Sequence, residues 1–357
     1  EKFADFFYPI SVTHFDEIVI ELKKIQPKGI VSIASDLTAI TVAKIAEIMN
    51  LPSNPLSVIQ IGTNKYQSRL LFEQAKLANP HFRLVTSEDD IIFIKKKFVF
   101  PVITKPTDRS GSRGIVRVES ADFLSKAIKT SQEQSFSKQV IVEEFFEGQE
   151  FSLEFLSING KHYCLAITEK ETTGFPHYIE TAHVQPSGLS SNITDRMIQT
   201  VSKALDTLGY KNGATHPELK VNDTGEICII EIGPRMGGDF IGSDLVQLST
   251  GYDFVKAVIE CSVGQNPEIP KYLKTKSSGV RFFFAKPGKV INIISQPQNI
   301  RGMIDWELDI KEGDMVHPIT QSAERLGYIL LQADNRNKLI EDMQMVHDNF
   351  IIETSAV

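Results

Sequence analysis

Cysteine, tryptophan and long hydrophobic runs are all scarce in this chain. Its 357 residues include three cysteines and one tryptophan. The cysteines, Cys164, Cys228 and Cys261, lie far apart in apolar surroundings, and none has the spacing of a metal site. We therefore expect reduced core thiols in a cytoplasmic protein. No apolar run approaches the roughly 20 residues that span a bilayer, so neither a membrane helix nor a membrane partner is expected.

Positive charge and two common nucleotide motifs are also lacking. Lys and Arg number 38 against 45 Asp and Glu, which gives a net charge of −7. No basic stripe interleaved with aromatic residues occurs, which argues against a nucleic-acid partner. The patterns G-x-x-x-x-G-K-[ST] and G-x-G-x-x-G are both absent, which excludes a Walker P-loop and weakens a dinucleotide-binding interpretation. What remains is an ordinary globular composition, long enough for two or three domains.

The predicted secondary structure divides the chain into three parts. The first part predicts an open parallel α/β unit, with a buried strand at 28–34, Asp36 as a helix N-cap, and helices at about 16–25, 37–49 and 65–78. From 82 to 151 the pattern is a small strand-rich unit with one helix at about 121–130. The remainder predicts a helix at about 193–208, a closing strand-helix pair at 328–349, and strands at 151–158, 163–168, 216–221, 226–232 and 280–285.

A predicted hairpin at 216–232 places two carboxylates on one face. Asn222-Asp-Thr-Gly225 predicts the turn, and if its ends face each other Glu218 pairs with Ile229. Glu231 lies two residues further on, so the two glutamates are expected as diagonal neighbours about 7–8 Å apart at the backbone. Two such carboxylates suit Mg²⁺, although a glutamate at each end of a hairpin is also typical of a solvated face. Glu231 interrupts an apolar strand and precedes a glycine-rich loop, which favours the metal site. Arg235 in that loop can hold a phosphate bidentately.

A second constellation follows a predicted strand that ends at Lys105. The loop Pro106-Thr-Asp-Arg-Ser110-Gly-Ser-Arg-Gly114 leads from it into the next strand. Glycine lets backbone N–H groups approach a phosphate closely, and the ammonium of Lys105 supplies positive charge at the base of the loop. The competing interpretation is a hairpin with a flexible tip.

A third constellation is Val140-Ile-Val-Glu143-Glu144-Phe-Phe146-Glu-Gly-Gln-Glu150. A nucleotide base needs backbone donors and acceptors beside an apolar slot, and ribose hydroxyls need a carboxylate. This connector can supply both. Taken alone, the pattern is more typical of a strand end over a core.

The three constellations, in this order, resemble the ATP-grasp superfamily, and most closely its group of L-amino-acid ligases and carbamoyl-phosphate-synthetase-like proteins. The resemblance covers nearly the whole chain up to about residue 264. It implies an N-terminal α/β domain at 1–80, a lid subdomain at 81–150, and at 151–357 a catalytic domain built on a large antiparallel sheet with a C-terminal subdomain. It also implies that a first strand-helix-strand unit of the N-terminal domain is missing from this sequence.

The resemblance further implies ATP and Mg²⁺ (or Mn²⁺) as cofactors. Glu218 and Glu231 would bind the metal, and Arg235 and Lys105 would be catalytic. The residues implied in ATP binding are Lys65, Lys105, Ser110, Gly111, Ser112, Gly114, Glu143, Glu144, Phe145, Phe146 and Glu150. Where many members have an asparagine as a further metal ligand, this chain has Gly233, which leaves a second metal position in doubt.

Substrate contacts are the least specified part of the sequence. His183, Arg281 and the backbone of Gly237 and Gly238 are candidates, although a lone histidine is more often structural. We expect an ATP-dependent ligase that joins a small carboxylate, such as an amino acid, to an amine through an acyl phosphate. The alternatives are a carboxylase, carbamoyl-phosphate or purine-biosynthesis activity, or a non-catalytic ATP-binding relative. A homodimer is expected from the resemblance alone.

Overall fold

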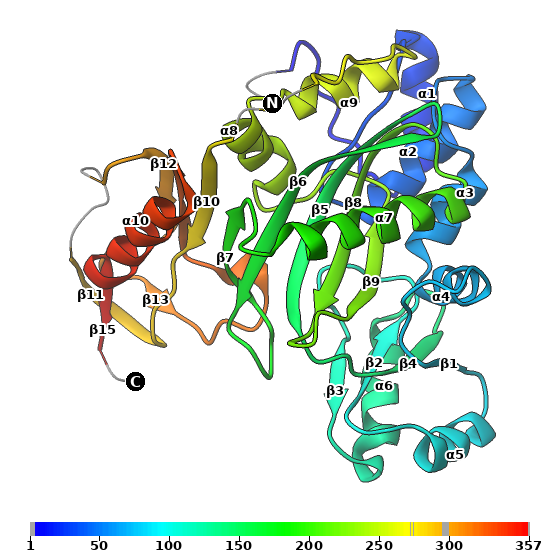
Figure 1. The fold of residues 1–357 in the computed structure, drawn as a ribbon, viewed down its shortest axis with the longest axis horizontal. Coiled ribbons are helices and arrows are strands. Elements are labelled where there is room, and N and C mark those ends of the chain that lie inside the picture. Colours follow the sequence, from blue (N-terminus) through cyan, green and yellow to red (C-terminus); the bar gives the residue numbers. More distant parts are fainter. Residues whose placement is uncertain (1–3, 272, 274, 295–299, 356–357) are drawn as a thin grey trace.

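The computed structural model describes residues 4–271, 273, 275–294 and 300–355. Figure 1 shows three parts around a central sheet: blue N-terminal helices, a small cyan unit on one side, and an orange-to-red C-terminal unit on the other. The predicted fold class is confirmed, because the chain is a mixed α/β structure with a small antiparallel unit and a large antiparallel sheet. No described helix combines the length and the apolar character needed to cross a bilayer.

The N-terminal part consists of helices, α1 (Phe15–Ile25), α2 (Asp36–Met49), α3 (Leu56–Thr63) and α4 (Lys65–Gln74). The strand predicted at 28–34 is wrong, because this segment pairs with no strand in the described residues. Helix α3 was not predicted. Ser35 takes the N-cap position of α2, whereas Asp36, predicted as the cap, is the first residue of the helix. The carboxylate of Asp36 is therefore not needed to cap the helix and can bind another group.

The small unit is a four-stranded sheet in the order β1-β4-β2-β3, covered by two helices. Its elements are β1 (Phe82–Val85), α5 (Glu88–Lys97), β2 (Val102–Pro106), β3 (Val116–Val118), η1 (Ala121–Phe123), α6 (Leu124–Gln134) and β4 (Val140–Glu144). The prediction of one helix here is wrong, because α5 was missed. That helix begins with three acidic residues and ends with three lysines, which suits the helix dipole. Ile94, Val102, Leu124 and Val142 form part of the unit's own core. We call this unit, residues 82–144, the lid.

The large sheet has eight strands in the order β12-β14-β10-β7-β6-β5-β8-β9. Its strands are β5 (Gln149–Ile158), β6 (Lys161–Thr172), β7 (Glu180–Gln185), β8 (Gly213–Val221), β9 (Ile227–Gly233), β10 (Ser277–Phe282), β12 (Met303–Leu308) and β14 (Gly327–Ala333). Helix α7 (Ser191–Leu208) packs on one face through Met197, Val201 and Leu205, which recur at helical spacing. The same core contains Phe151, Leu219 and Ile229 from the sheet.

The remaining elements frame the C-terminal side. They are η2 (Ile241–Leu245), α8 (Val246–Thr250), α9 (Phe254–Ser262), η4 (Ser322–Glu324), α10 (Arg336–Asn349) and a second small sheet of β13 (Met315–Val316), β11 (Gly288–Ile294) and β15 (Ile351–Thr354). Helix α10 packs its Leu339, Met343 and Val346 against the C-terminal core. Through β10, β12 and β14 this part completes the large sheet.

Candidate functional site

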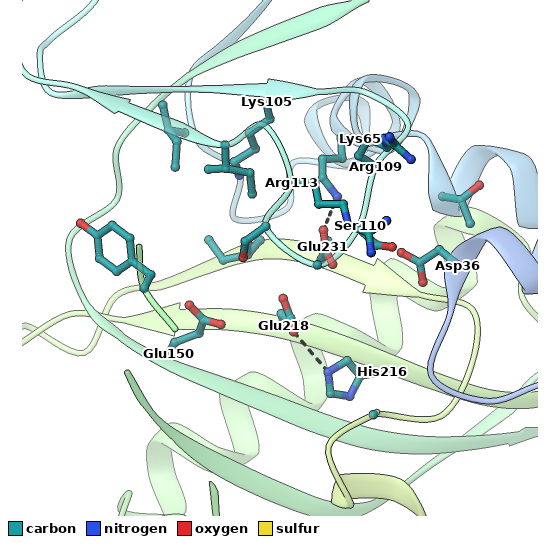
Figure 2. A pocket seen from close by; sticks show the side chains of 18 of the residues that line it. Asp36, Lys65, Lys105, Arg109, Ser110, Arg113, Glu150, His216, Glu218 and Glu231 are labelled. Carbon is teal, nitrogen blue, oxygen red and sulfur yellow. Dashed lines mark hydrogen bonds and ion pairs between the residues drawn. The ribbon is translucent and has the colours of Figure 1, made fainter. Parts of the chain in front are cut away.

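A cavity of about 860 Å³ lies where the lid, the large sheet and the N-terminus of α2 meet. Figure 2 shows Lys105 on the lid side, Glu218 on the opposite strand, and Lys65 and Glu231 between them. Three residues predicted for the site do not line this cavity: Gly114, Gly237 and Arg281. Those that do are Lys65, Lys105, Ser110, Gly111, Ser112, Glu143, Glu144, Phe145, Phe146, Glu150, His183, Glu218, Glu231, Arg235 and Gly238.

The β8–β9 hairpin presents both glutamates through a β-bulge. Leu219 pairs with Ile229 and Glu218 pairs with Glu231, which leaves Ile230 as the extra residue. The predicted pairing of Glu218 with Ile229 is therefore wrong, because the turn shifts the register by one and the bulge by one more. The glutamates are direct partners instead of diagonal neighbours. A bulge adds one residue to one strand and so reverses the alternation of faces beyond it.

Glu218 is held by a lysine and a histidine. Lys170 Nζ lies 2.7 Å from its Oε1, and His216 Nε2 lies 3.2 Å from the same oxygen. Burial alone raises the pKa of Glu218, but Lys170 and His216 outweigh it, and the pKa falls well below the ordinary value. The other ring nitrogen of His216 contacts the fully buried Glu154. Burial lowers the pKa of His216, yet Glu154 and Glu218 together raise it above its ordinary value, so its protonated form is favoured.

Glu231 is paired with Lys65, the first residue of α4. Burial lowers the pKa of Lys65, but Glu231, Asp36 and Glu218 together outweigh burial and raise it, so this lysine stays charged. Its backbone N–H also donates to Thr107 O at 2.9 Å, which ties α4 to the base of the predicted phosphate loop.

These two carboxylates fit a divalent cation. No cluster of three or more potential metal-ligating side chains occurs in the described chain. Among the described residues, Lys170 and His216 contact Oε1 of Glu218, and Lys65 contacts Oε2 of Glu231. The second oxygen of each carboxylate is therefore available to a cation. Two carboxylate oxygens, supplemented by water and phosphate, are the set that Mg²⁺ commonly takes.

Lys105 is fixed by a buried charge network. Its Nζ lies 2.8 Å from Glu143 Oε2, and Arg69 Nε donates to Glu143 Oε1 at 2.7 Å. Both oxygens of Glu143 are thus engaged, which favours a role in orienting Lys105, and the implied role of Glu143 in ATP binding stays a prediction. The N–H groups of Glu144 and Phe145, two of the residues implied in ATP binding, donate to His81 O and Pro101 O.

The loop between β2 and β3 arches over the cavity. Ser110, Gly111 and Ser112 line it, together with two arginines, Arg109 and Arg113, that were not predicted. Gly114 has a different role, since a Cβ there would lie 2.8 Å from Gln134 Cβ and 2.9 Å from Pro106 Cγ. Its missing side chain lets the loop pack against α6.

The predicted nucleotide end of the cavity combines aromatic rings with cations. The guanidinium carbon of Arg117 lies 4.3 Å and Lys220 Nζ 4.5 Å from the centre of the Phe145 ring. Glu150, one of the residues implied in ATP binding, pairs with Lys170 at 3.1 Å. Lys170 therefore bridges Glu150 and Glu218, and burial, which lowers its pKa, is outweighed by these carboxylates.

At the other end, Arg235 is held by the N-terminal part. Its Nε donates to Asp36 Oδ1 at 2.7 Å, and its Nη1 donates to Met236 O at 3.1 Å. Burial alone lowers the pKa of Arg235, whereas Asp36 and Glu231 raise it. The guanidinium thus lies beside the carboxylate pair.

Of the residues predicted to contact substrate, some line the cavity and others do not. His183 lines the cavity fully buried, with Nε2 3.8 Å from Asp239 Oδ2, and burial lowers its pKa. Arg281 faces Glu171 at 3.9 Å and does not line the cavity, so the structure gives its predicted substrate contact no support. The N–H of Gly237 donates to Glu154 Oε2 at 3.1 Å, and Gly237 does not line the cavity, whereas Gly238 lies at the cavity wall.

Sequence reasoning missed the charged partners Asp36, Arg69, Glu154 and Lys170. The signal for Lys170 was weak, because it lies in an alternating strand where a lysine is normally solvent-facing. Asp36 was visible only as a helix start. Arg69 lies one helical turn after Lys65, and that spacing places the two on one face.

The fold and this charged cavity define an α/β protein with a lid over a large antiparallel sheet, and two family models describe it more closely. Residues 98–244 match the ATP-grasp domain, and residues 281–355 match L-amino acid ligase C-terminal domain 2. The chain therefore contains an ATP-grasp domain followed by an L-amino acid ligase C-terminal domain, which confirms the resemblance stated from the sequence.

Known proteins agree in fold. An L-amino acid ligase from Bacillus licheniformis superposes with a TM-score of 0.84 at 22% identity, over 96% of this chain and 84% of that one. A biotin carboxylase from Campylobacter jejuni, solved as a β,γ-ATP complex, gives a TM-score of 0.73 at 17% identity over 95% and 78%. The alanine–anticapsin ligase of Bacillus amyloliquefaciens is 24% identical over 307 residues, which cover 76% of this chain and 64% of the length of that ligase.

Proposed function

We propose that this protein is an ATP-dependent carboxylate–amine ligase, and that its carboxylate substrate is an amino acid. The observation that carries the proposal is the convergence in one cavity of Lys65, Lys105 and Arg235 with the paired carboxylates of Glu218 and Glu231. The L-amino acid ligase C-terminal domain, matched at 281–355, supports the choice of substrate.

The proposed reaction has two steps. A carboxylate oxygen of the first substrate attacks the γ-phosphorus of ATP, the bond to the bridging oxygen breaks, and ADP leaves. The amine of the second substrate then attacks the carbonyl carbon of the acyl phosphate, loses a proton and expels phosphate, which forms an amide. Phosphorylation is required because the oxygen of a free carboxylate is a poor leaving group.

The chain's own groups contribute position and charge. Lys65 and Lys105 approach the phosphates, and Arg235 neutralises the transferred phosphoryl group. Glu218 and Glu231 would hold Mg²⁺, which when bound supplies further charge neutralisation. The loop of Ser110–Gly114 and the rest of the lid exclude water, because water would hydrolyse the acyl phosphate.

An ADP-release assay with pooled amino acids and simple carboxylic acids tests the proposal. Turnover that requires two amino acids supports it, and bicarbonate-dependent turnover would favour a carboxylase or carbamoyl-phosphate activity instead. ATP binding without turnover in any pool would favour a non-catalytic relative.

The role of Glu231 gives a sharper test. Glu231→Gln keeps the size of the side chain but removes the charge that faces Glu218 and Lys65. We expect a loss of about 10²–10³-fold in ADP release, the usual effect of removing one preorganised charge partner. Glu226→Gln, at the exposed end of the same hairpin, is the matched control and should leave the rate unchanged. Full activity of Glu231→Gln would remove Glu231 from the mechanism.

A further inference from the structure

We propose that Arg69 is a positioning residue that fixes Lys105 and Glu231 relative to each other. The inference rests on the proposed function, which gives those two residues their roles. Arg69 lies on α4, is 2% exposed, and is not itself at the cavity surface. Its guanidinium joins three parts of the molecule: the N-terminal helices, the lid and the large sheet.

The first link is to the β-bulge. Arg69 Nη1 donates to Ile229 O at 2.7 Å, and Nη2 donates to Ile230 O at 2.8 Å. Ile229 and Ile230 are the last regularly paired residue and the extra residue of the bulge. The guanidinium therefore binds the two carbonyls at which β9 departs from a regular strand.

The bulge decides where Glu231 points. Ile229 and Ile232 belong to the buried core, whereas Ile230 and Glu231 both line the cavity. In a regular strand, alternation from Ile229 would turn Glu231 toward the core and Ile232 toward the cavity. Only the extra residue places Glu231 opposite Glu218. By binding the bulge, Arg69 favours the backbone that keeps the second carboxylate in the site.

The second link is to Lys105. Arg69 binds Glu143 with Nε at 2.7 Å and with Nη2 at 3.2 Å, and Glu143 in turn binds Lys105 Nζ at 2.8 Å. Glu143 on β4 and Lys105 on β2 belong to the lid. One guanidinium thus holds the lid lysine through Glu143 and the opposing carboxylate through the bulge.

Arginine suits this position better than lysine. Its planar fork presents several N–H donors at fixed angles, so a carboxylate and two carbonyls can be bound at once. Asn79 Nδ2 donates to the Arg69 backbone carbonyl at 3.1 Å and adds a further contact to this residue. A lysine at 69 would keep the charge but could not reproduce this set of bonds.

Binding of Mn²⁺ in the presence of ADP, followed by the electron paramagnetic resonance signal of free Mn²⁺, tests the inference. Arg69→Lys should weaken Mn²⁺ binding about 10- to 100-fold, as loss of a partner that orients metal ligands commonly does. Arg83→Lys is the matched control, because Arg83 also binds an aspartate, Asp90, at 2.8 Å but at the outer side of the lid. It should bind Mn²⁺ and ADP as the unaltered protein does.

A merely structural Arg69 would change the melting temperature and leave the affinity of the folded protein unchanged, and that result would overturn the inference. If Arg69→Lys does not fold, Arg69→Met is the second variant, because it leaves the buried Glu143 paired with Lys105 and creates no unpaired charge. It should fold and bind Mn²⁺ weakly, and unaltered affinity there would also overturn the inference. Failure of the unaltered protein to bind Mn²⁺ with ADP would instead overturn the proposed function, and this inference with it.

Discussion

Each carboxylate on the cavity floor is matched by a cation from a different element. Lys65 of α4 pairs with Glu231 of β9, and Lys170 of β6 pairs with Glu218 of β8. Two glutamates at directly paired positions would otherwise repel each other and turn away. The lysines therefore keep both carboxylates pointing into the cavity.

The buried Glu143 predicts how stability depends on pH. Burial raises its pKa, but Arg69 and Lys105 outweigh burial and hold the pKa at about 2, below the ordinary 4.5. In this pH range the unfolded chain binds the proton that the folded protein excludes. The stabilisation is therefore complete above pH 4.5 and is lost as the pH falls toward 2. Its size is on the order of 3 kcal/mol.

Urea unfolding at a series of pH values measures this dependence. Glu143→Gln should be less stable at neutral pH, because it leaves Arg69 and Lys105 buried without their counter-ion, and its stability should fall less steeply between pH 4.5 and 2. Glu73→Gln, an exposed change on α4, should keep the slope of the unaltered protein. An unchanged slope in Glu143→Gln would show that another carboxyl group controls acid unfolding.

At the scale of single residues, the candidate ligand-binding side chains are easier to predict from the sequence than the buried charged residues that fix their positions. Lys105, Glu218 and Glu231 stand in recognisable local patterns, and the structure brings them to one cavity. Arg69 and Lys170 act through partners far away in the chain, so no local pattern distinguishes them from ordinary charged residues. Arg281 was predicted from its place on an apolar strand, and such a place does not say which face the side chain takes.

Among the elements, the hairpin shows both the strength and the limit of prediction. Its two strands and its turn follow from β-branched residues and the Asn-Asp-Thr-Gly sequence, and all are present. The bulge could not be predicted, because it is bound by Arg69 of a distant helix. The segment 28–34 shows the reverse case, since its apolar residues suit a strand but no partner strand lies beside it among the described residues.

The loop from β2 to β3 offers a test at this scale. Gly111 and Gly114 both have positive φ, at 66° and 73°. A Cβ at 111 would meet open space, whereas one at 114 would lie within 3 Å of Gln134 and Pro106. Gly111→Ala should cost about 1 kcal/mol of backbone strain. Gly114→Ala should cost a further 1–3 kcal/mol or so, because α6 must shift.

Urea unfolding of the two variants measures the difference. The paired design removes the shared effect of positive φ, so the remainder reports the packing of the loop against α6. Equal loss of stability in both variants would show that the loop is free to move away from α6 at 114.

In the molecule as a whole, the cavity belongs to no single part. α2 contributes Asp36, α4 contributes Lys65, the lid contributes Lys105, and the large sheet contributes both glutamates. Such a site binds its ligand strongly only when the parts are held together. The general arrangement of a lid over a large sheet was predictable from the resemblance. The helical N-terminal part was not, because its order of apolar segments fits an α/β unit equally well.

A ligand that contacts all these parts should stabilise them together. Binding to the folded state alone adds about 2.7 kcal/mol at a ligand concentration of 100 times the dissociation constant. With Mg²⁺ and ADP we therefore expect slower amide hydrogen exchange in the loop of residues 107–115 and at the ends of β8 and β9. The small sheet of β13, β11 and β15 contributes no lining residue to the cavity and is the internal control.

Protection confined to β8 and β9 would show that the nucleotide binds the sheet without engaging the loop, and the role of the lid in excluding water would then have to be abandoned. Slower exchange in the loop as well as in β8 and β9 would place the nucleotide between the loop and the strands, because a ligand bound to one of them alone would not slow exchange in both.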